Sequence, residues 1–242
     1  MCSSDLRAFT GYFKAIGQDA HAPLTMLLET GDDKMRTDVM IIILEIKLTS
    51  AIPSIRALTK DEKLGFFAAR ICAMLGDKEV VPELKAMFEG ASEPRRIQII
   101  GSLSGQKDTA LAPFYCLACG DDFVSVRRSA QNALVATGKG SMTDIIAFLD
   151  DGNTVRTRML LEALGRLGGP DCVLLLMSRL DPATNGDWRI RFSAITALQK
   201  CKADLSDSDK SKLRAAIKTE TNEQCRREYS RLLSEELEWK TP

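Results

Sequence analysis

The most constraining feature of this sequence is a repeat of about thirty residues. A two-residue motif, Ala-Leu in its clearest copies, returns along the whole chain, and its second members are residues 13, 44, 74, 103, 134, 164, 198 and 232. The intervals between these anchor positions are 31, 30, 29, 31, 30, 34 and 34 residues. A nearly constant period of this length is typical of chains built from stacked, similar supersecondary units.

Prolines keep the same period independently of the anchors. They stand at residues 23, 53, 82 and 113, at intervals of 30, 29 and 31, each early in the second apolar segment of its unit. Proline is tolerated at the start of a helix, where the first amides have no intrahelical acceptor, and is costly further inside. These prolines therefore predict where the second helix of each unit begins.

Apolar residues within each unit follow a helical spacing. In one unit Val126, Ala130, Ala133, Leu134 and Gly138 would share a single face. Turns that carry Gly or Asp separate the two helices, as in "LGDK" and "TGKGS", and β-branched alternation bounded by turns is missing. The sequence therefore predicts an all-α chain of about seven to eight helical pairs.

A single helical pair cannot bury its apolar face alone, whereas stacked pairs can share a continuous core. We therefore expect one repeat domain over residues 1–242. Its approximate units are 3–30, 33–59, 61–90, 92–120, 122–151, 153–182, 186–219 and 221–238. The last two intervals are longer, and the extra residues fall in "LDPATNGDW" and "KADLSDSDK", where we expect loops.

Three features of these units resemble a known family: Val/Ile-Arg openings at 126–127, 155–156 and 190–191, Ala-Leu pairs beginning at 133, 163 and 197, and the "VVPEL" segment at 80–84. Together they resemble HEAT repeats, and more narrowly the short HEAT-like repeats of the phycobilisome-lyase type, from about residue 5 to about residue 235. The resemblance implies a right-handed α-α superhelix. It also implies binding and scaffolding more than any particular reaction.

Composition narrows the class of protein further. Acidic and basic residues are equal at 33 each, and the two halves of the chain are also balanced, so bulk charge does not indicate nucleic acid or a membrane surface. Seven cysteines are too dilute for a disulfide-stapled domain. The longest apolar stretches fall short of the ~20 residues of a membrane span, and "MCSSDLRAF" lacks the pattern of a secretory leader. We expect a cytoplasmic protein.

The recurrent arginines have two interpretations. The favoured one, which the resemblance implies, is a structural ladder in which each guanidinium joins neighbouring repeats by meeting an acidic side chain or a helix-end carbonyl. The ladder residues are Arg96, Arg127, Arg156 and Arg191. The alternative is an anion or nucleic-acid track that also includes Arg95, Arg128, Arg158 and Arg189. Residues 156–191 contain six arginines and four acids, an excess of only two, and Arg128 is expected to face solvent.

The cysteines, the histidine and the glycine-rich "GKG" segment do not form a recognisable reactive site. "CLAC" at 116–119 has no second ligand pair, so we expect its cysteines to pack as small apolar groups, as do Cys72, Cys172 and Cys201. His21 is the only histidine, which excludes nucleophilic triads and multi-histidine metal sites. "GKG" at 138–140 lacks the rest of a phosphate loop and is interpreted as a turn. We predict no catalytic residue, metal or cofactor.

Two tryptophans lie at junctions. Trp188 follows the extra residues "PATNG" and precedes Arg189, so it is either a staple onto the preceding repeat or an exposed anchor for a partner. Trp239 is expected to close the end of the repeat array.

The sequence therefore predicts a non-catalytic protein–protein interaction scaffold or regulatory adaptor whose partner is another protein. The candidate partner-binding residues are Trp188, Arg189, Arg128 and Arg158. Two alternatives stay open: a nucleic-acid-binding HEAT-like protein that uses the repeated arginines, and a lyase-like accessory subunit suggested by the resemblance alone.

Overall fold

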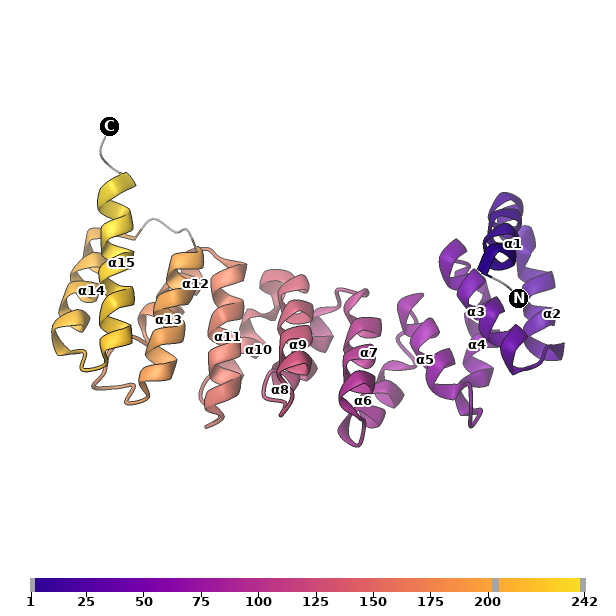
Figure 1. Ribbon diagram of the computed structural model, residues 1–242, viewed down its shortest axis with the longest axis horizontal. Coiled ribbons are helices and arrows are strands. Elements are labelled where there is room, and N and C mark those ends of the chain that lie inside the picture. Colours follow the sequence, from indigo (N-terminus) through magenta and orange to yellow (C-terminus); the bar gives the residue numbers. More distant parts are fainter. Residues whose placement is uncertain (1–2, 202–204, 240–242) are drawn as a thin grey trace. The chain divides into compact units, whose positions relative to one another are not determined.

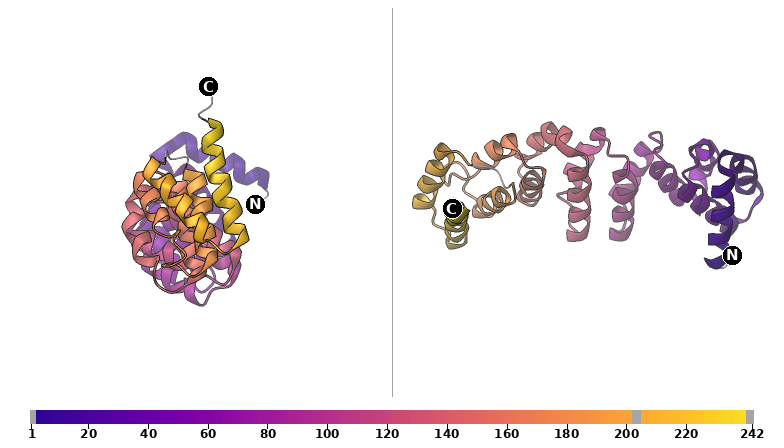
Figure 2. Two further views of the ribbon diagram at one scale, coloured as in Figure 1. Left: turned by 90° about the vertical axis from the view of Figure 1, so that its left-hand side faces the viewer. Right: turned by 90° about the horizontal axis from the view of Figure 1, so that it is seen from above.

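The computed structural model describes residues 3–201 and 205–239, and every regular element in these ranges is a helix. Figures 1 and 2 show helices and connecting loops, with no strand in the described ranges. The prediction of an all-α chain is confirmed for this part of the protein. Contacts divide the chain into two compact units, Met1–Lys107 and Asp108–Pro242.

The N-terminal unit consists of helices that alternate between a first and a second helix of each pair. They are α1 (Ser3–Ile16), α2 (His21–Thr30), α3 (Asp33–Ile46), α4 (Ile52–Ala57), α5 (Gly65–Met74), α6 (Val81–Glu89) and α7 (Glu93–Ser104), with short 3-10 turns η1 (Gly17–Ala20), η2 (Thr49–Ala51) and η3 (Leu58–Lys60). The first helices α1, α3, α5 and α7 pack against one another in sequence, and α2 packs against α4.

The C-terminal unit continues the alternation. Its elements are η4 (Thr109–Leu111), α8 (Ala112–Ala118), α9 (Val124–Ala136), η5 (Gly138–Ser141), α10 (Met142–Phe148), α11 (Thr154–Leu167), α12 (Pro170–Met177), α13 (Trp188–Cys201), α14 (Asp207–Thr219) and α15 (Glu223–Trp239). Helices α9, α11, α13 and α15 follow one another in a row, as Figure 1 shows, and α8 packs against α10. Within this unit the first helices therefore form one layer and the second helices another.

Helix starts lie where the sequence signals place them. Pro53, Pro82 and Pro113 occupy the first two positions of α4, α6 and α8, and Pro23 lies in the first turn of α2. At each of these positions the missing N–H has no intrahelical acceptor, so proline costs little. The interpretation of the prolines as helix beginnings is confirmed.

The turns between paired helices depend on backbone freedom. Gly76 and Gly138 have φ angles of 95° and 76°, a region that residues with a Cβ rarely adopt. "GKG" forms the turn η5, as predicted. The extra residues between α12 and α13 form a loop, whereas part of the second insertion, residues 202–204, lies outside the described residues.

The core follows the repeat period. Each second helix buries at least one large side chain, and these are Leu24, Ile55, Leu84, Tyr115, Ile145, Leu176 and Leu213. In the first helices the anchors Phe13, Leu103, Leu134, Leu164, Leu198 and Leu232 are buried. The expectation that every anchor is buried is wrong at two positions. Leu44 is only half-buried, and Met74, at the end of α5, is 46% exposed. There Ile71, Cys72 and Ala73 fill the interior instead.

Helices α11 and α13 approach each other very closely. A Cβ built on Gly165 would lie 2.7 Å from the Ala197 carbonyl oxygen and 2.8 Å from its Cα. Glycine at 165 and alanine at 197 therefore set the separation of these two helices. This close packing fixes the relative positions of the polar side chains that α11 and α13 expose.

Candidate partner-binding face

Six arginines in the first turns of first helices contact residues that lie five to seven positions earlier in the chain. They are Arg36, Arg96, Arg127, Arg156, Arg191 and Arg226. Arg127 Nη1 donates to the carbonyl oxygens of Asp121 and Asp122 at 2.6 and 2.9 Å, and Arg96 Nη2 donates to the Glu89 carbonyl at 2.8 Å. These carbonyls lie at or just beyond helix C-termini, where a cation is favourable.

Two members of this set, Arg36 and Arg226, were missed by the sequence reasoning. Arg36 Nη2 donates to the Glu29 carbonyl at 2.9 Å, and Arg226 Nε donates to the Glu220 carbonyl at 2.5 Å. Their signal was present, because each stands in the first turn of a first helix as Arg127 does. Met35 and Cys225 precede them, so the Val/Ile-Arg opening of 126–127, 155–156 and 190–191 is absent at both positions.

Arg156 spans more than one helical pair. Its guanidinium forms an ion pair with Asp151, which follows α10, and lies 3.5 Å from the carbonyl oxygen of Leu117 in α8, two helical pairs earlier. A Cβ on Gly120 would lie 2.8 Å from Arg156 Nη2, so glycine makes room for the crossing side chain. This arginine therefore contributes to structure, with its guanidinium turned away from solvent.

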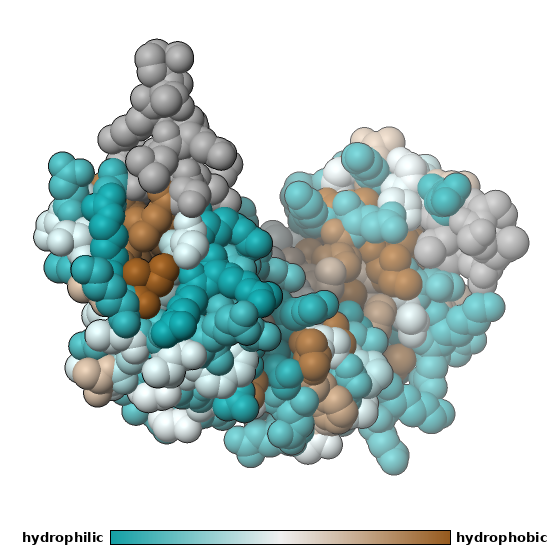
Figure 3. Space-filling view, turned by 60° about the vertical axis from the view of Figure 1, so that its left-hand side comes forward, coloured by the Kyte–Doolittle hydropathy of each residue, from teal (hydrophilic) through white to brown (hydrophobic). Residues whose placement is uncertain are grey.

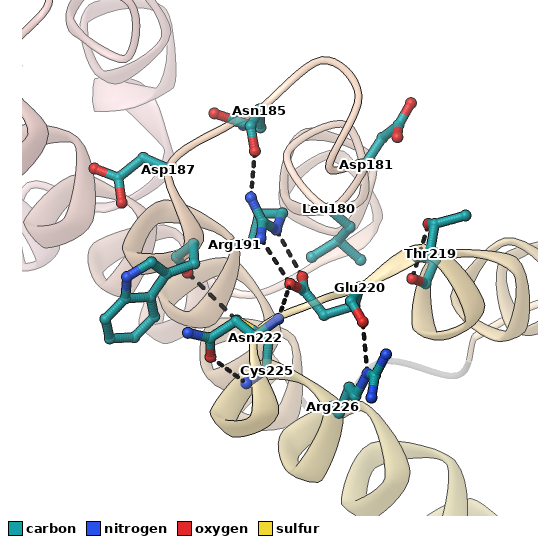
Figure 4. A network of polar contacts seen from close by, with 12 residues as sticks. Leu180, Asp181, Asn185, Asp187, Arg191, Thr219, Glu220, Asn222, Cys225 and Arg226 are labelled. Atoms are coloured by element: carbon teal, nitrogen blue, oxygen red, sulfur yellow. Dashed lines mark hydrogen bonds and ion pairs between the residues drawn. The ribbon is translucent and has the colours of Figure 1, made fainter.

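Arg191 lies at the centre of a buried network, drawn in Figure 4. Its Nε and Nη2 donate to the two carboxylate oxygens of Glu220, both at 2.7 Å, and its Nη1 donates to the Asn185 carbonyl at 2.5 Å. Glu220 also accepts from the backbone N–H of Asn222 at 2.8 Å. Burial alone would raise the pKa of Glu220, but the hydrogen bonds from Arg191 and Asn222 outweigh it and lower that pKa.

The remaining sequence-predicted residues lie on the outside of the C-terminal unit. Arg128, Arg158 and Arg189 are exposed, and Trp188 is half-buried. Trp188 and Phe192 meet edge to face with ring centroids 6.4 Å apart, and the Arg189 guanidinium lies 5.4 Å from the Trp188 ring. Arg95 belongs to the N-terminal unit, where it stacks 4.0 Å from the ring of Phe66.

Exposed cations share one face of α9, α11 and α13. We call this surface the basic face and define it by Arg128, Arg158, Arg166, Arg189 and Lys200, all exposed. On α11, Arg158 and Arg166 are two turns apart on the same side, with Glu162 between them. On α13, Arg189 and Lys200 are three turns apart on one side.

Hydrogen bonds between helices join the basic face into one surface. Arg158 Nε donates to Ser193 Oγ of α13 at 3.3 Å, and Arg166 Nη1 donates to Asn132 Oδ1 of α9 at 2.8 Å. Lys200 Nζ lies 3.5 Å from Glu162 Oε1. The repeat places Arg128, Arg158 and Phe192 at equivalent positions, and likewise Arg166 and Lys200.

Charge in this unit is segregated by layer. Helices α9, α11 and α13 contain eight Lys and Arg residues and one acidic residue, Glu162. Helices α8, α10 and α12 contain no basic residue and two acidic residues, Asp144 and Asp171. The other acids of this stretch lie in loops: Asp121, Asp122, Asp150, Asp151, Asp181 and Asp187. The balanced composition therefore conceals a positive first-helix layer.

A second exposed surface of the same unit is a groove between α10 and α12. It has a volume of about 500 Å³ and is lined by Met142, Ile146, Leu174 and Leu175, with Lys139 at one end. Leu174 is 64% exposed. The groove offers apolar contact area without the charge pattern of the basic face. In each unit the surface visible in Figure 3 interleaves hydrophilic and apolar patches.

Among the described cysteines five are buried free thiols and Cys201 is half-buried. Burial raises the pKa of Cys116 to about 12 and raises that of Cys119 further. In the part of the chain that the structure describes, no group of three or more His, Cys, Asp or Glu side chains is arranged to hold a metal ion. His21 Nδ1 lies 3.1 Å from Ser50 Oγ in the N-terminal unit.

None of the described helices combines the length and apolarity that crossing a membrane requires. The side chain of Trp239 lies outside the residues whose side chains the structure describes. Comparison with known proteins finds no matching family model and no matching curated protein.

Proposed function

We propose that this chain is a non-catalytic α-solenoid of HEAT-like repeats that acts as a scaffold or adaptor by binding another protein. The repeated helical pairs within each unit support the solenoid, as does the row of first-turn arginines that cap preceding helices. A solenoid has a large surface relative to its core, and its repeated side chains form extended binding faces.

The observation that carries the binding role is the basic face. Among the described residues no carboxylate lies within ion-pair distance of Arg128, Arg158 or Arg166, although acidic residues are as numerous as basic ones in the chain. Uncompensated cations repel one another and lower the stability of a folded domain, so a clustered excess is favourable only when a partner supplies the opposite charge.

The experiment is chemical cross-linking of the full-length chain in a native extract, followed by identification of the attached proteins. We expect Arg128→Glu/Arg158→Glu/Arg166→Glu to lose a subset of them. The matched control is Lys139→Glu/Lys212→Glu/Lys218→Glu, which reverses the same number of charges away from the basic face and should keep that subset. Identical sets of attached proteins for the two variants would refute the proposal.

The basic face also supports a second candidate function, nucleic-acid binding. This function requires a track of arginines that can contact phosphates. Backbone carbonyls or carboxylates already bind four of them: Arg96, Arg127, Arg156 and Arg191. Arg128, Arg158 and Arg189 stay exposed. An electrophoretic mobility shift at low ionic strength tests this function, because phosphate contacts weaken steeply as salt is added. A shift that Arg158→Glu abolishes would favour it over protein binding.

A further inference from the structure

We propose that the basic face binds an acidic, partly apolar peptide segment of the partner protein. This inference rests on the proposed function, since it names the chemistry of the segment that the scaffold would hold. The basic face carries more cations than acids, and neutral side chains orient two of its arginines. Acidic residues lie around it, and aromatic residues lie at one edge.

Arg158 and Arg166 are held in position without being neutralised, whereas Arg189 and Lys200 lie 3.7 and 3.5 Å from the carboxylates of Asp187 and Glu162. Arg166 is oriented by Asn132 and by Gln131 Oε1, at 2.8 and 3.3 Å, and Arg158 by Ser193 at 3.3 Å. Neutral hydrogen-bond acceptors fix a guanidinium yet leave its charge uncancelled. Five cations against Glu162 and Asp187 give the face a net charge of +3. Such a preorganised positive surface is complementary to carboxylates.

The distribution of acids around the face favours a peptide over a nucleic acid. Asp121 and Asp122 precede α9, Asp187 precedes α13 and lies 3.7 Å from Arg189, and Glu162 lies in the middle of the face. A nucleic-acid backbone carries charge at every nucleotide and would bring phosphates near these acids. A peptide can place carboxylates opposite the arginines and neutral residues opposite Glu162.

Aromatic residues at one edge indicate that the segment also carries an apolar residue. Phe192 occupies, on α13, the repeat position that Arg128 and Arg158 occupy on α9 and α11. It is half-buried and meets the ring of Trp188, over which Arg189 stacks. Aromatic and arginine side chains together are typical of the residues that contribute most to protein–protein binding.

The dimensions of the basic face limit the length of the segment. Adjacent packed helices lie about 8–10 Å apart, so the axes of α9 and α13 are roughly 16–20 Å apart across α11. An extended peptide rises about 3.3 Å per residue, so roughly six residues would cross the three helices. A contact of this size is small, and we expect weak, salt-sensitive binding.

The test uses the full-length chain and a fluorescein-labelled peptide of about twelve residues that contains glutamates and two leucines, read by fluorescence anisotropy. We expect binding that is lost with the peptide in which glutamine replaces every glutamate. Arg158→Glu/Arg166→Glu should weaken binding by about tenfold or more, and Lys139→Glu/Lys218→Glu should leave it unchanged. Glu162→Gln removes the acid in the middle of the face and should strengthen binding about two- to fivefold, an effect that partial unfolding cannot mimic.

Three outcomes would overturn the inference: no binding of the acidic peptide, binding that Arg158→Glu/Arg166→Glu leaves intact, or Glu162→Gln having no effect. Labelled single-stranded and duplex DNA of about twenty nucleotides, at the same ionic strength, form the other arm. DNA that binds more tightly than the peptide, and is lost with the same variants, would also overturn it. If the set of cross-linked proteins changes with the basic face but the acidic peptide does not bind, only the inference about the peptide is refuted. If neither cross-linking nor peptide binding depends on the basic face, the proposed function is refuted as well.

Discussion

Replacing Glu220 by glutamine should strongly destabilise the C-terminal unit. Arg191 and Glu220 are 3% and 0% exposed, and two charge-assisted hydrogen bonds of 2.7 Å join them. Glutamine keeps the shape but removes the charge, and its NH₂ group would face a guanidinium that can only donate. Breaking one side of a buried ion pair costs about 3–5 kcal/mol, because the other charge stays buried without compensation.

The matched control is Glu223→Gln, whose partner Arg227 lies in an exposed ion pair on the same helix. Exposed pairs contribute little, so this change should alter the free energy of unfolding by no more than about 0.5 kcal/mol. Arg191→Met/Glu220→Met removes both charges together and should recover most of the loss. Comparing the single and double variants shows whether the loss of stability comes from the uncompensated charge of Arg191 or from any substitution at this site.

Urea unfolding followed by Trp188 fluorescence, in a Trp239→Phe background, reports on this junction because the Trp188 carbonyl accepts a hydrogen bond from Cys225 of α15. A cost below about 1 kcal/mol for Glu220→Gln would refute the reasoning that Arg191 is left with a buried, uncompensated charge. The pH dependence gives a second check. Since the pKa of Glu220 is lowered in the folded chain, its stabilisation is complete above the unfolded value of about 4.3 and is lost as pH falls below it. The glutamine variant should lose less stability than the parent chain over that acidic range.

Three further predictions test the ladder, the helix spacing and the cysteines. Arg127→Ala removes two hydrogen bonds to helix-end carbonyls and should cost about 1–2 kcal/mol in urea unfolding, whereas exposed Arg128→Ala should stay within about 0.5 kcal/mol; equal losses would contradict the structural role of Arg127. Gly165→Ala forces α11 away from α13 and should lower the thermal midpoint with a cost of about 1–3 kcal/mol, whereas Gly101→Ala, which meets no atom within 4 Å in the interior of α7, should raise stability by about 0.5–1 kcal/mol. Because burial raises the pKa of Cys116 to about 12, this thiol should resist iodoacetamide at pH 8 in the folded chain and react after denaturation, as peptide mass spectrometry would show; rapid labelling of the native chain would contradict its burial.

Several features of the site were predictable because they depend on local sequence. Proline at the start of α4, α6 and α8 follows from the unpaired amides of a helix N-terminus, wherever the helix lies in the fold. The exposure of Arg128 follows in the same way, because Val126 and Ala130 fix the buried side of α9.

Other features depend on residues far apart in the chain. The partner of Arg191 is Glu220, 29 residues later, and no short motif connects the two. Sequence reasoning named Arg128, Arg158 and Arg189 but missed their cluster with Arg166 and Lys200, because a linear window through residues 156–191 adds the acids of α12 and its loop to the arginines of α11 and α13. In the folded unit those acids lie on other elements, so the local charge differs from the sum along the chain.

By itself the sequence determined that the chain is helical, where many of its helices begin, and which positions recur in each unit. These properties follow from hydrogen bonding and apolar periodicity over a few neighbouring residues. Only the tertiary structure decided which groups the capping arginines meet, such as Glu220 for Arg191, and that Arg158, Arg166 and Lys200 share a surface with Glu162. The physical reason is that electrostatic interaction depends on distance in space, and packing of α9, α11 and α13 brings together charges that the sequence separates by about thirty residues.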